Sequence, residues 1–123
     1  MELAKLPEAE LEIMMIIWEA QKSVNSDYIM EKLKGVKKWK RTTLLNLLSR
    51  LCERGYLECR KEGKINIYTP LVKEKDYLDN ASRSFFEKLH KNSLTSLIAS
   101  LYDSKSVSKS DLEELEKFIR EAE

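Results

Sequence analysis

The sequence contains few of the residues that interrupt helices or carry out catalysis: three glycines, two prolines, two cysteines and one histidine in 123 residues. This scarcity of glycine and proline excludes collagen-like, proline-rich and β-sandwich proteins and favours helix over most of the chain. The longest uninterrupted apolar run, Ile13 to Trp18, has six residues, whereas a membrane-spanning helix needs roughly 18. The first residues lack the basic region and cleavage site of a signal peptide. We therefore expect a cytoplasmic protein with no membrane insertion.

Residues that bind metals or act as nucleophiles are equally scarce. The spacing of Cys52 and Cys59 matches no common zinc or redox motif, so we interpret both as small apolar residues, and a redox role for either stays open. The single histidine, His90, lies between Lys88 and Lys91 and is interpreted as a surface residue. The sequence has no glycine-rich phosphate loop and no nucleophile elbow. We expect a non-enzymatic protein that needs no cofactor and no metal.

Charge is unevenly distributed along the chain, although the net charge is only +1. Residues 35–64 contain nine basic and three acidic residues, whereas residues 73–123 contain nine basic and eleven acidic residues. A locally basic segment is the electrostatic footprint of a polyanionic partner. A solvated, lysine-rich surface is the alternative that charge alone leaves open.

The spacing of apolar residues predicts a mainly α fold with one β-hairpin. Helices are expected at about residues 7–21, 26–34, 40–54, 73–91 and 93–102, with a last helix starting at 108–111. Strands are expected at 56–60 and 65–69, joined by a turn that contains Gly63. Three helices followed by a hairpin is the order of a winged helix-turn-helix. We predict a winged-helix DNA-binding domain at residues 1–72 and a helical dimerisation domain at residues 73–123.

The helix predicted at residues 40–54 has two contrasting faces. At about 100° per residue, four leucines share one face and polar residues share the other. In a winged helix this helix enters the major groove, and the hairpin tip approaches the DNA backbone. Thr and Asn side chains can contact base edges, while Lys and Arg mostly hold phosphates. The candidate DNA-binding residues are Lys40, Arg41, Thr42, Thr43, Asn46, Arg50, Lys61 and Lys64.

Apolar side chains recur along the C-terminal helices. About 50 residues cannot easily bury so many apolar groups in an isolated subunit, so we expect a homodimer. Packing against the winged helix is the alternative. The candidate dimerisation residues are Phe85, Leu89, Leu94, Leu97, Ile98, Leu101, Leu112, Leu115, Phe118 and Ile119.

Several stretches resemble the BlaI/MecI family of penicillinase and methicillin-resistance repressors. They are residues 9–14 with 16–18, Trp39 with Thr43, residues 47–51 with Gly55 and Tyr56, residues 64–65 with Tyr68 and 71–72, and residues 96–98 and 111–115. The resemblance implies a homodimeric transcriptional repressor whose winged helix reads double-stranded DNA at a palindromic operator with TACA/TGTA-type halves. Thr43 and Arg50 stand where the family has Thr and Arg, whereas Asn46 stands where the best-known members have Thr, and Thr42 where some members have Lys.

The resemblance also implies inactivation by proteolysis. Family members that respond to β-lactams are cut at an Asn-Phe bond in the dimerisation region, after a signal from a membrane sensor-protease system. The matching position here is Ser100-Leu101. A copper-responsive branch carries Cys-x-Cys motifs near its C-terminus, which this sequence lacks. Because a fold does not fix a function, a winged helix that serves only as a protein interaction module is the alternative function.

Overall fold

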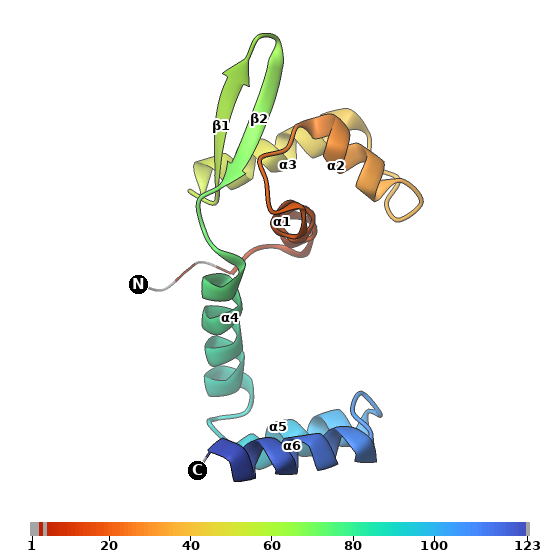
Figure 1. Cartoon of the computed structure of the whole chain (residues 1–123), viewed down its shortest axis with the longest axis vertical. Helices are drawn as coiled ribbons and strands as arrows, with labels where there is room; N and C mark the ends of the chain where they lie inside the picture. Colours follow the sequence, from red (N-terminus) through yellow and green to blue (C-terminus); the bar gives the residue numbers. More distant parts are fainter. Residues whose placement is uncertain (1–2, 4, 123) are drawn as a thin grey trace. The chain divides into compact units, whose positions relative to one another are not determined.

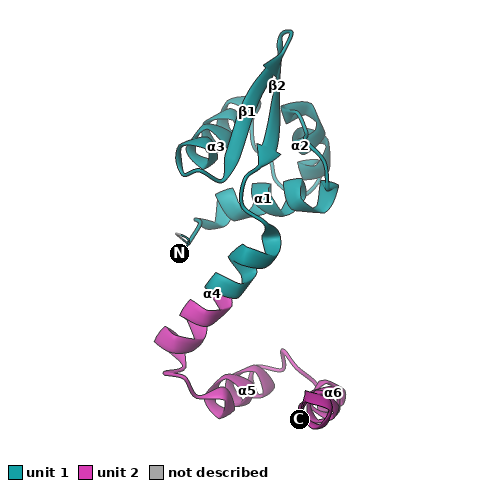
Figure 2. Cartoon of the chain, turned by 60° about the vertical axis from the view of Figure 1, so that its left-hand side comes forward, with its two compact units in different colours: residues 1–80 teal, residues 81–123 magenta. Residues whose placement is uncertain are grey.

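The computed structural model describes residue 3 and residues 5–122, and it divides the chain into two compact units, residues 1–80 and 81–123 (Figure 2). Six helices and one hairpin are found in the described residues (Figure 1). They are α1 (Glu8–Ala20), α2 (Ser26–Leu33), α3 (Arg41–Glu53), β1 (Leu57–Glu62), β2 (Ile65–Pro70), α4 (Glu74–Leu89), α5 (Leu94–Asp103) and α6 (Lys109–Ala122). All the predicted elements form, and the predicted fold class is confirmed.

The core of unit 1 is formed by α1, α2, α3 and the base of the hairpin. Its apolar side chains come from positions three and four residues apart on each helix, which places them on one face. Burying each of these side chains contributes about 1.5–3 kcal/mol to folding. The most deeply buried are Ile13, Met14, Ile17, Ile29, Leu44, Leu48, Leu51 and Leu57.

Helix α3 ends where the sequence predicts it, at a glycine. Gly55 has φ +82°, a left-handed conformation that glycine adopts without steric cost. Its N–H donates to the carbonyl of Cys52 at 3.1 Å, and the N–H of Tyr56 donates to the carbonyl of Leu51 at 3.0 Å. These two bonds form a Schellman motif, which satisfies the last carbonyls of the helix. The chain then turns directly into β1.

Strands β1 and β2 form an antiparallel hairpin in which Glu62 pairs with Ile65. The connecting turn has only two residues, and Gly63 takes its first position with φ +65°, as a tight hairpin turn requires. Val24, between α1 and α2, exchanges two backbone hydrogen bonds with Tyr68, at 3.1 and 2.7 Å. The hairpin is therefore anchored to the helices at its base, and its turn extends beyond them (Figure 1).

The first part of α4 belongs to unit 1. The N–H of Leu6 donates to the hydroxyl of Tyr77 at 3.0 Å, and the indole of Trp18 donates to the carbonyl of Val72 at 2.9 Å. The Tyr77 ring also lies 5.7 Å from the Trp18 ring and 5.9 Å from the Tyr56 ring, between centroids. These contacts fix the start of α4 to the winged helix. The predicted functional division between residues 72 and 73 stays a prediction.

Unit 2 contains helices with well-formed N-termini but no buried core. Ser93 accepts a hydrogen bond from the N–H of Ser96 at 3.1 Å at the start of α5. Ser108 and Asp111 cap each other's backbone N–H groups before α6, in the manner of a capping box. From residue 81 to residue 122, all of which the structure describes, no side chain is buried. No helix within the described part of the chain is long and apolar enough to cross a membrane.

Candidate nucleic-acid interface

The outer face of α3 presents polar side chains to solvent. Thr42, Thr43 and Asn46 are exposed, whereas Leu44 and Leu48, on the opposite face, are fully buried. The described residues provide no hydrogen-bond partner for these three polar side chains. Hydroxyl and carboxamide groups that are unpaired and face outward from a rigid helix are suited to reading base edges. The amphipathic helix predicted from the leucine spacing is confirmed.

Basic residues lie at both ends of this polar face. Lys40 precedes the first turn of α3 as its N-cap, and Arg50 lies in the last turn. Both are exposed. The N-terminal turn of a helix also favours an anion, because its backbone N–H groups point outward. The face therefore combines neutral hydrogen-bonding groups with a cation at each end.

The turn of the hairpin carries the other predicted cations. Lys64 lies in the turn itself and Lys61 lies in β1, opposite Asn66. Both lysines are exposed, and Ile65 beside them is 52% exposed. Arg60 is instead paired with Glu62, at 2.8 Å between Nη2 and Oε1. Lys61 and Lys64 are thus the basic side chains available at the tip of the hairpin.

Arg41 differs from the other predicted cations because its guanidinium is already engaged. Nη1 donates to the hydroxyl of Ser26 at 2.8 Å, and Nη2 donates to a carboxylate oxygen of Asp27. Asp27 was not among the residues predicted for the site. The only signal available was an acidic residue in the first turn of α2, which is ordinary for a helix.

A second ion pair that the sequence analysis missed holds the other end of α3. Glu10 is 1% exposed, and its carboxylate accepts a hydrogen bond from Nε of Arg54 at 2.8 Å. Arg54 is the residue that ends α3, and Glu10 lies in the first turn of α1. A buried carboxylate needs such a partner because desolvation of an unpaired charge is costly. The pair fixes α3 against α1.

The two cysteines are not joined in a disulfide, and one of them is partly covered. Cys52 is half-buried and Cys59 is exposed. Burial raises the pKa of the Cys52 thiol above its ordinary value, and the neighbouring Cys59 raises it further. A raised pKa keeps the thiol protonated and therefore less nucleophilic. Within the described residues, no cluster of three or more His, Cys, Asp or Glu side chains could hold a metal ion.

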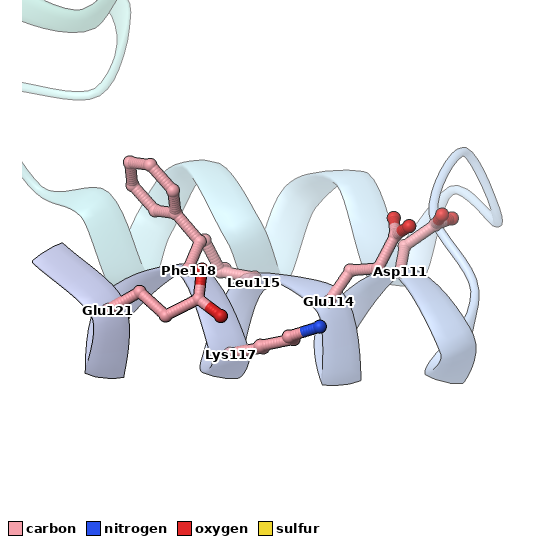
Figure 3. A pocket seen from close by; sticks show the side chains of 6 residues that line it. All are labelled: Asp111, Glu114, Leu115, Lys117, Phe118 and Glu121. Atoms are coloured by element: carbon pink, nitrogen blue, oxygen red, sulfur yellow. The ribbon is translucent and has the colours of Figure 1, made fainter.

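The predicted dimerisation residues are all exposed or half-buried. Phe85, Leu89, Leu94, Phe118 and Ile119 are between 46% and 68% exposed. The other five, which are half-buried, are Leu97, Ile98, Leu101, Leu112 and Leu115. A hollow of about 480 Å³ lies along α6 between apolar and charged side chains, with the Phe118 ring standing out from the helix (Figure 3). The predicted cleavage bond, Ser100-Leu101, lies inside α5.

Comparison with known proteins decides the family. A family model described as "Penicillinase repressor" matches residues 6–121. The chain belongs to the penicillinase repressor family. Relatives in this family include the penicillinase repressor of Bacillus licheniformis, which is 29% identical over 119 residues covering 97% of this chain and 92% of the relative. The methicillin resistance regulatory protein MecI of Staphylococcus aureus is 30% identical over 115 residues, covering 94% of this chain and 93% of MecI.

Solved structures from the penicillinase repressor family share the fold. The solution structure of the DNA-binding domain of the repressor BlaI matches with a TM-score of 0.54 and 35% identity, covering 63% of this chain and 94% of that domain. Monomeric BlaI from Bacillus licheniformis, in complex with the blaP half-operator, matches with a TM-score of 0.52 and 33% identity, covering 62% and 92%. The predicted winged helix and the predicted resemblance to the BlaI/MecI family are confirmed.

Proposed function

We propose that the protein is a transcriptional repressor that binds a palindromic DNA operator as a homodimer. The observation that carries this proposal is the outer face of α3, where Thr42, Thr43 and Asn46 are exposed and unpaired among the described residues. Membership of the penicillinase repressor family supports it. The family and the scarcity of catalytic residue types also favour a non-enzymatic protein. As a DNA-binding regulator, it acts in the cytoplasm, where bacterial DNA lies.

In this proposal each surface of the winged helix has its own role. Thr42, Thr43 and Asn46 face the base edges in the major groove, where an Asn can pair with adenine through two hydrogen bonds. Lys40 and Arg50 contact phosphates on either side of the groove, since such contacts position the protein without reading sequence. The hairpin lysines contact the adjacent backbone. Base contacts therefore give specificity, and phosphate contacts give most of the salt-dependent affinity.

The proposed dimer is supported by the absence of buried side chains from the described residues of unit 2. No side chain between residues 81 and 122 is buried, although α5 and α6 carry large apolar residues such as Leu94 and Phe118. Leaving so much apolar surface in water is unfavourable by about 25 cal/mol for each Å². A second copy of the same helices would cover these residues, and its two-fold symmetry would match a palindromic site. Residues 73–123 are accordingly the proposed dimerisation domain, and residues 1–72 the proposed DNA-binding domain.

Relief of repression is proposed to follow cleavage between Ser100 and Leu101, triggered through a membrane sensor-protease system that responds to β-lactams or cell-wall stress. Ser100 is exposed on α5. A cut there would remove α6 from the rest of the chain. The two half-site contacts would then lose their linkage, and affinity for the full operator would fall.

Two substitutions separate the proposed base contacts from the proposed phosphate contacts. Asn46→Ala is expected to reduce discrimination between operator and scrambled duplex by about 1–3 kcal/mol, because a bidentate base contact is lost. Lys64→Ala is expected to weaken binding to both duplexes and to lower the slope of log K against log salt by about 0.9 per subunit. Fluorescence anisotropy over a salt series measures both effects.

The control is Lys88→Ala, which removes an exposed lysine from α4 in unit 2 and should change neither quantity. If both Asn46→Ala and Lys64→Ala bind DNA as the unsubstituted protein does, the groove assignment is wrong. A winged helix that acts only as a protein interaction module would give that result.

A further inference from the structure

The two bonds of Arg41 join the beginnings of two helices. Ser26 and Asp27 are the first two residues of α2, and Arg41 is the first residue of α3. The guanidinium reaches both partners with different nitrogen atoms, across sequence separations of 15 and 14 residues. A planar guanidinium that donates to two acceptors is fixed in orientation as well as position. The contact therefore restrains how α3 sits relative to α2.

This restraint acts beside a short connection whose first residues are held by hydrogen-bonded turns to the end of α2. Between α2 and α3 the chain from residue 34 to residue 40 forms neither helix nor strand, and Gly35 adopts φ +81°. In a helix-turn-helix, the angle between these two helices sets how the second one enters the major groove. A hydrogen-bonded contact between their N-termini is therefore well placed to control how Thr42, Thr43 and Asn46 approach DNA.

The electrostatics of this corner favour the internal pair over a phosphate contact. The positive end of the α3 dipole is unfavourable for a cation at Arg41, whereas the positive end of the α2 dipole is favourable for the carboxylate of Asp27. If Arg41 turned to a phosphate, the unpaired carboxylate of Asp27 would remain close to that phosphate and repel it. Both side chains are more than half exposed, at 51% and 74%, so the pair contributes little to overall stability.

We infer that Arg41 is a positioning residue that joins α2 to the start of α3 through Asp27 and Ser26, and that it does not serve as a phosphate contact. Asp27 is its partner in determining specificity. The inference rests on the proposed DNA-binding function and refines it. Of the two candidate cations at this end of α3, Lys40 is then the one left to contact phosphate.

The salt dependence of binding to a scrambled duplex tests the first part. Arg41→Ala is expected to leave the slope of log K against log salt unchanged, while Lys64→Ala lowers it by about 0.9 per subunit. Lys64→Ala thus shows that the assay resolves one phosphate contact. A slope for Arg41→Ala that falls as much as that of Lys64→Ala would overturn the inference. Circular dichroism confirms that each variant is folded before binding is measured.

Binding to a palindromic duplex with TACA and TGTA halves tests the role in specificity. Arg41→Ala and Asp27→Asn are each expected to lower the operator-to-scrambled affinity ratio roughly three- to tenfold, and the double variant should be no weaker than either single variant. The direction of the change in this ratio for Asp27→Asn is informative, because removing a negative charge would by itself strengthen DNA binding. A higher ratio for Asp27→Asn, or additive losses in the double variant, would overturn the inference.

The same measurements distinguish failure of this inference from failure of the proposed function. If the unsubstituted protein binds both duplexes equally, the proposed recognition of this operator is wrong. The salt slopes measured on the scrambled duplex still decide whether Arg41 contacts phosphate. If the unsubstituted protein prefers the palindrome but Arg41→Ala lowers the slope of log K against log salt, the repressor proposal stands and the positioning role is wrong.

Discussion

Phe118→Glu is expected to convert the proposed dimer into monomers and to lower affinity for a full palindromic operator by about 10²-fold or more. The Phe118 ring is 66% exposed on α6, beside Leu115 (Figure 3), and in the proposed dimer it is covered by the second subunit. A carboxylate at this position would have to be desolvated without a partner. Once the subunits separate, each half-site is bound independently, and the gain from linkage is lost. Sedimentation equilibrium and anisotropy measure the two effects.

Ser110→Glu is the matched control for this substitution. It changes the charge by the same amount on the same helix, at an exposed polar residue near the start of α6. The Ser110→Glu protein should remain a dimer by sedimentation equilibrium, and its affinity for the operator should be unchanged. A Phe118→Glu protein that remains dimeric would contradict the assigned interface. A monomer that still binds the full operator as tightly would contradict the role of dimerisation in binding.

Leu48→Ala is expected to lower the free energy of unfolding of the winged helix by about 2–5 kcal/mol. Leu48 is fully buried between α3 and the rest of the core, so truncation leaves a cavity that its neighbours fill only in part. This loss is a large share of the roughly 5–15 kcal/mol that a domain has in total. Urea denaturation followed by circular dichroism measures it.

Leu45→Ala provides the comparison, because the same side chain is removed from the same helix at a position that is 38% exposed. Leu45→Ala is expected to lower the free energy of unfolding by no more than about 0.5–1 kcal/mol. Equal losses for the two variants would show that α3 does not bury the face described here. A larger loss for Leu45→Ala would place the other face of the helix in the core.

The sequence was enough to predict the local structure of the DNA-binding region. The leucine spacing predicted which face of α3 is buried, and Gly55 predicted where the helix ends, because both signals act within a few residues. The change to alternating residues after Tyr56, with Gly63 in the turn, predicted the hairpin. These features depend on local geometry, so a single sequence contains them.

Contacts between distant residues were not predictable in the same way. The pairing of Glu10 with Arg54 joins residues 44 positions apart, and charge alone gives each of them several possible partners. Likewise, Arg41 was predicted from its charge to hold phosphate, whereas its contacts with α2 depend on how two helices pack. The place of Tyr77 in the core of unit 1 also depends on packing, since its own helix continues into unit 2.

These distant contacts show how a short helix can hold its proposed base-reading face in place. The pair between Glu10 and Arg54 fixes the end of α3, and the bonds of Arg41 to α2 restrain its beginning. The backbone of a helix held at both ends loses little freedom on binding, and such preorganisation favours affinity and specificity. The hairpin is anchored separately through Val24 and Tyr68.

The most direct test of operator recognition is a comparison of two duplexes by fluorescence anisotropy. One contains a palindromic site with TACA and TGTA halves, and the other contains the same bases in scrambled order. At physiological salt, the protein is expected to prefer the palindrome by about 10³-fold or more. The affinity should also fall steeply with salt, as several phosphate contacts require. Equal affinity for the two duplexes, or no binding to either at low salt, would contradict the assignment of this protein as a repressor of such an operator.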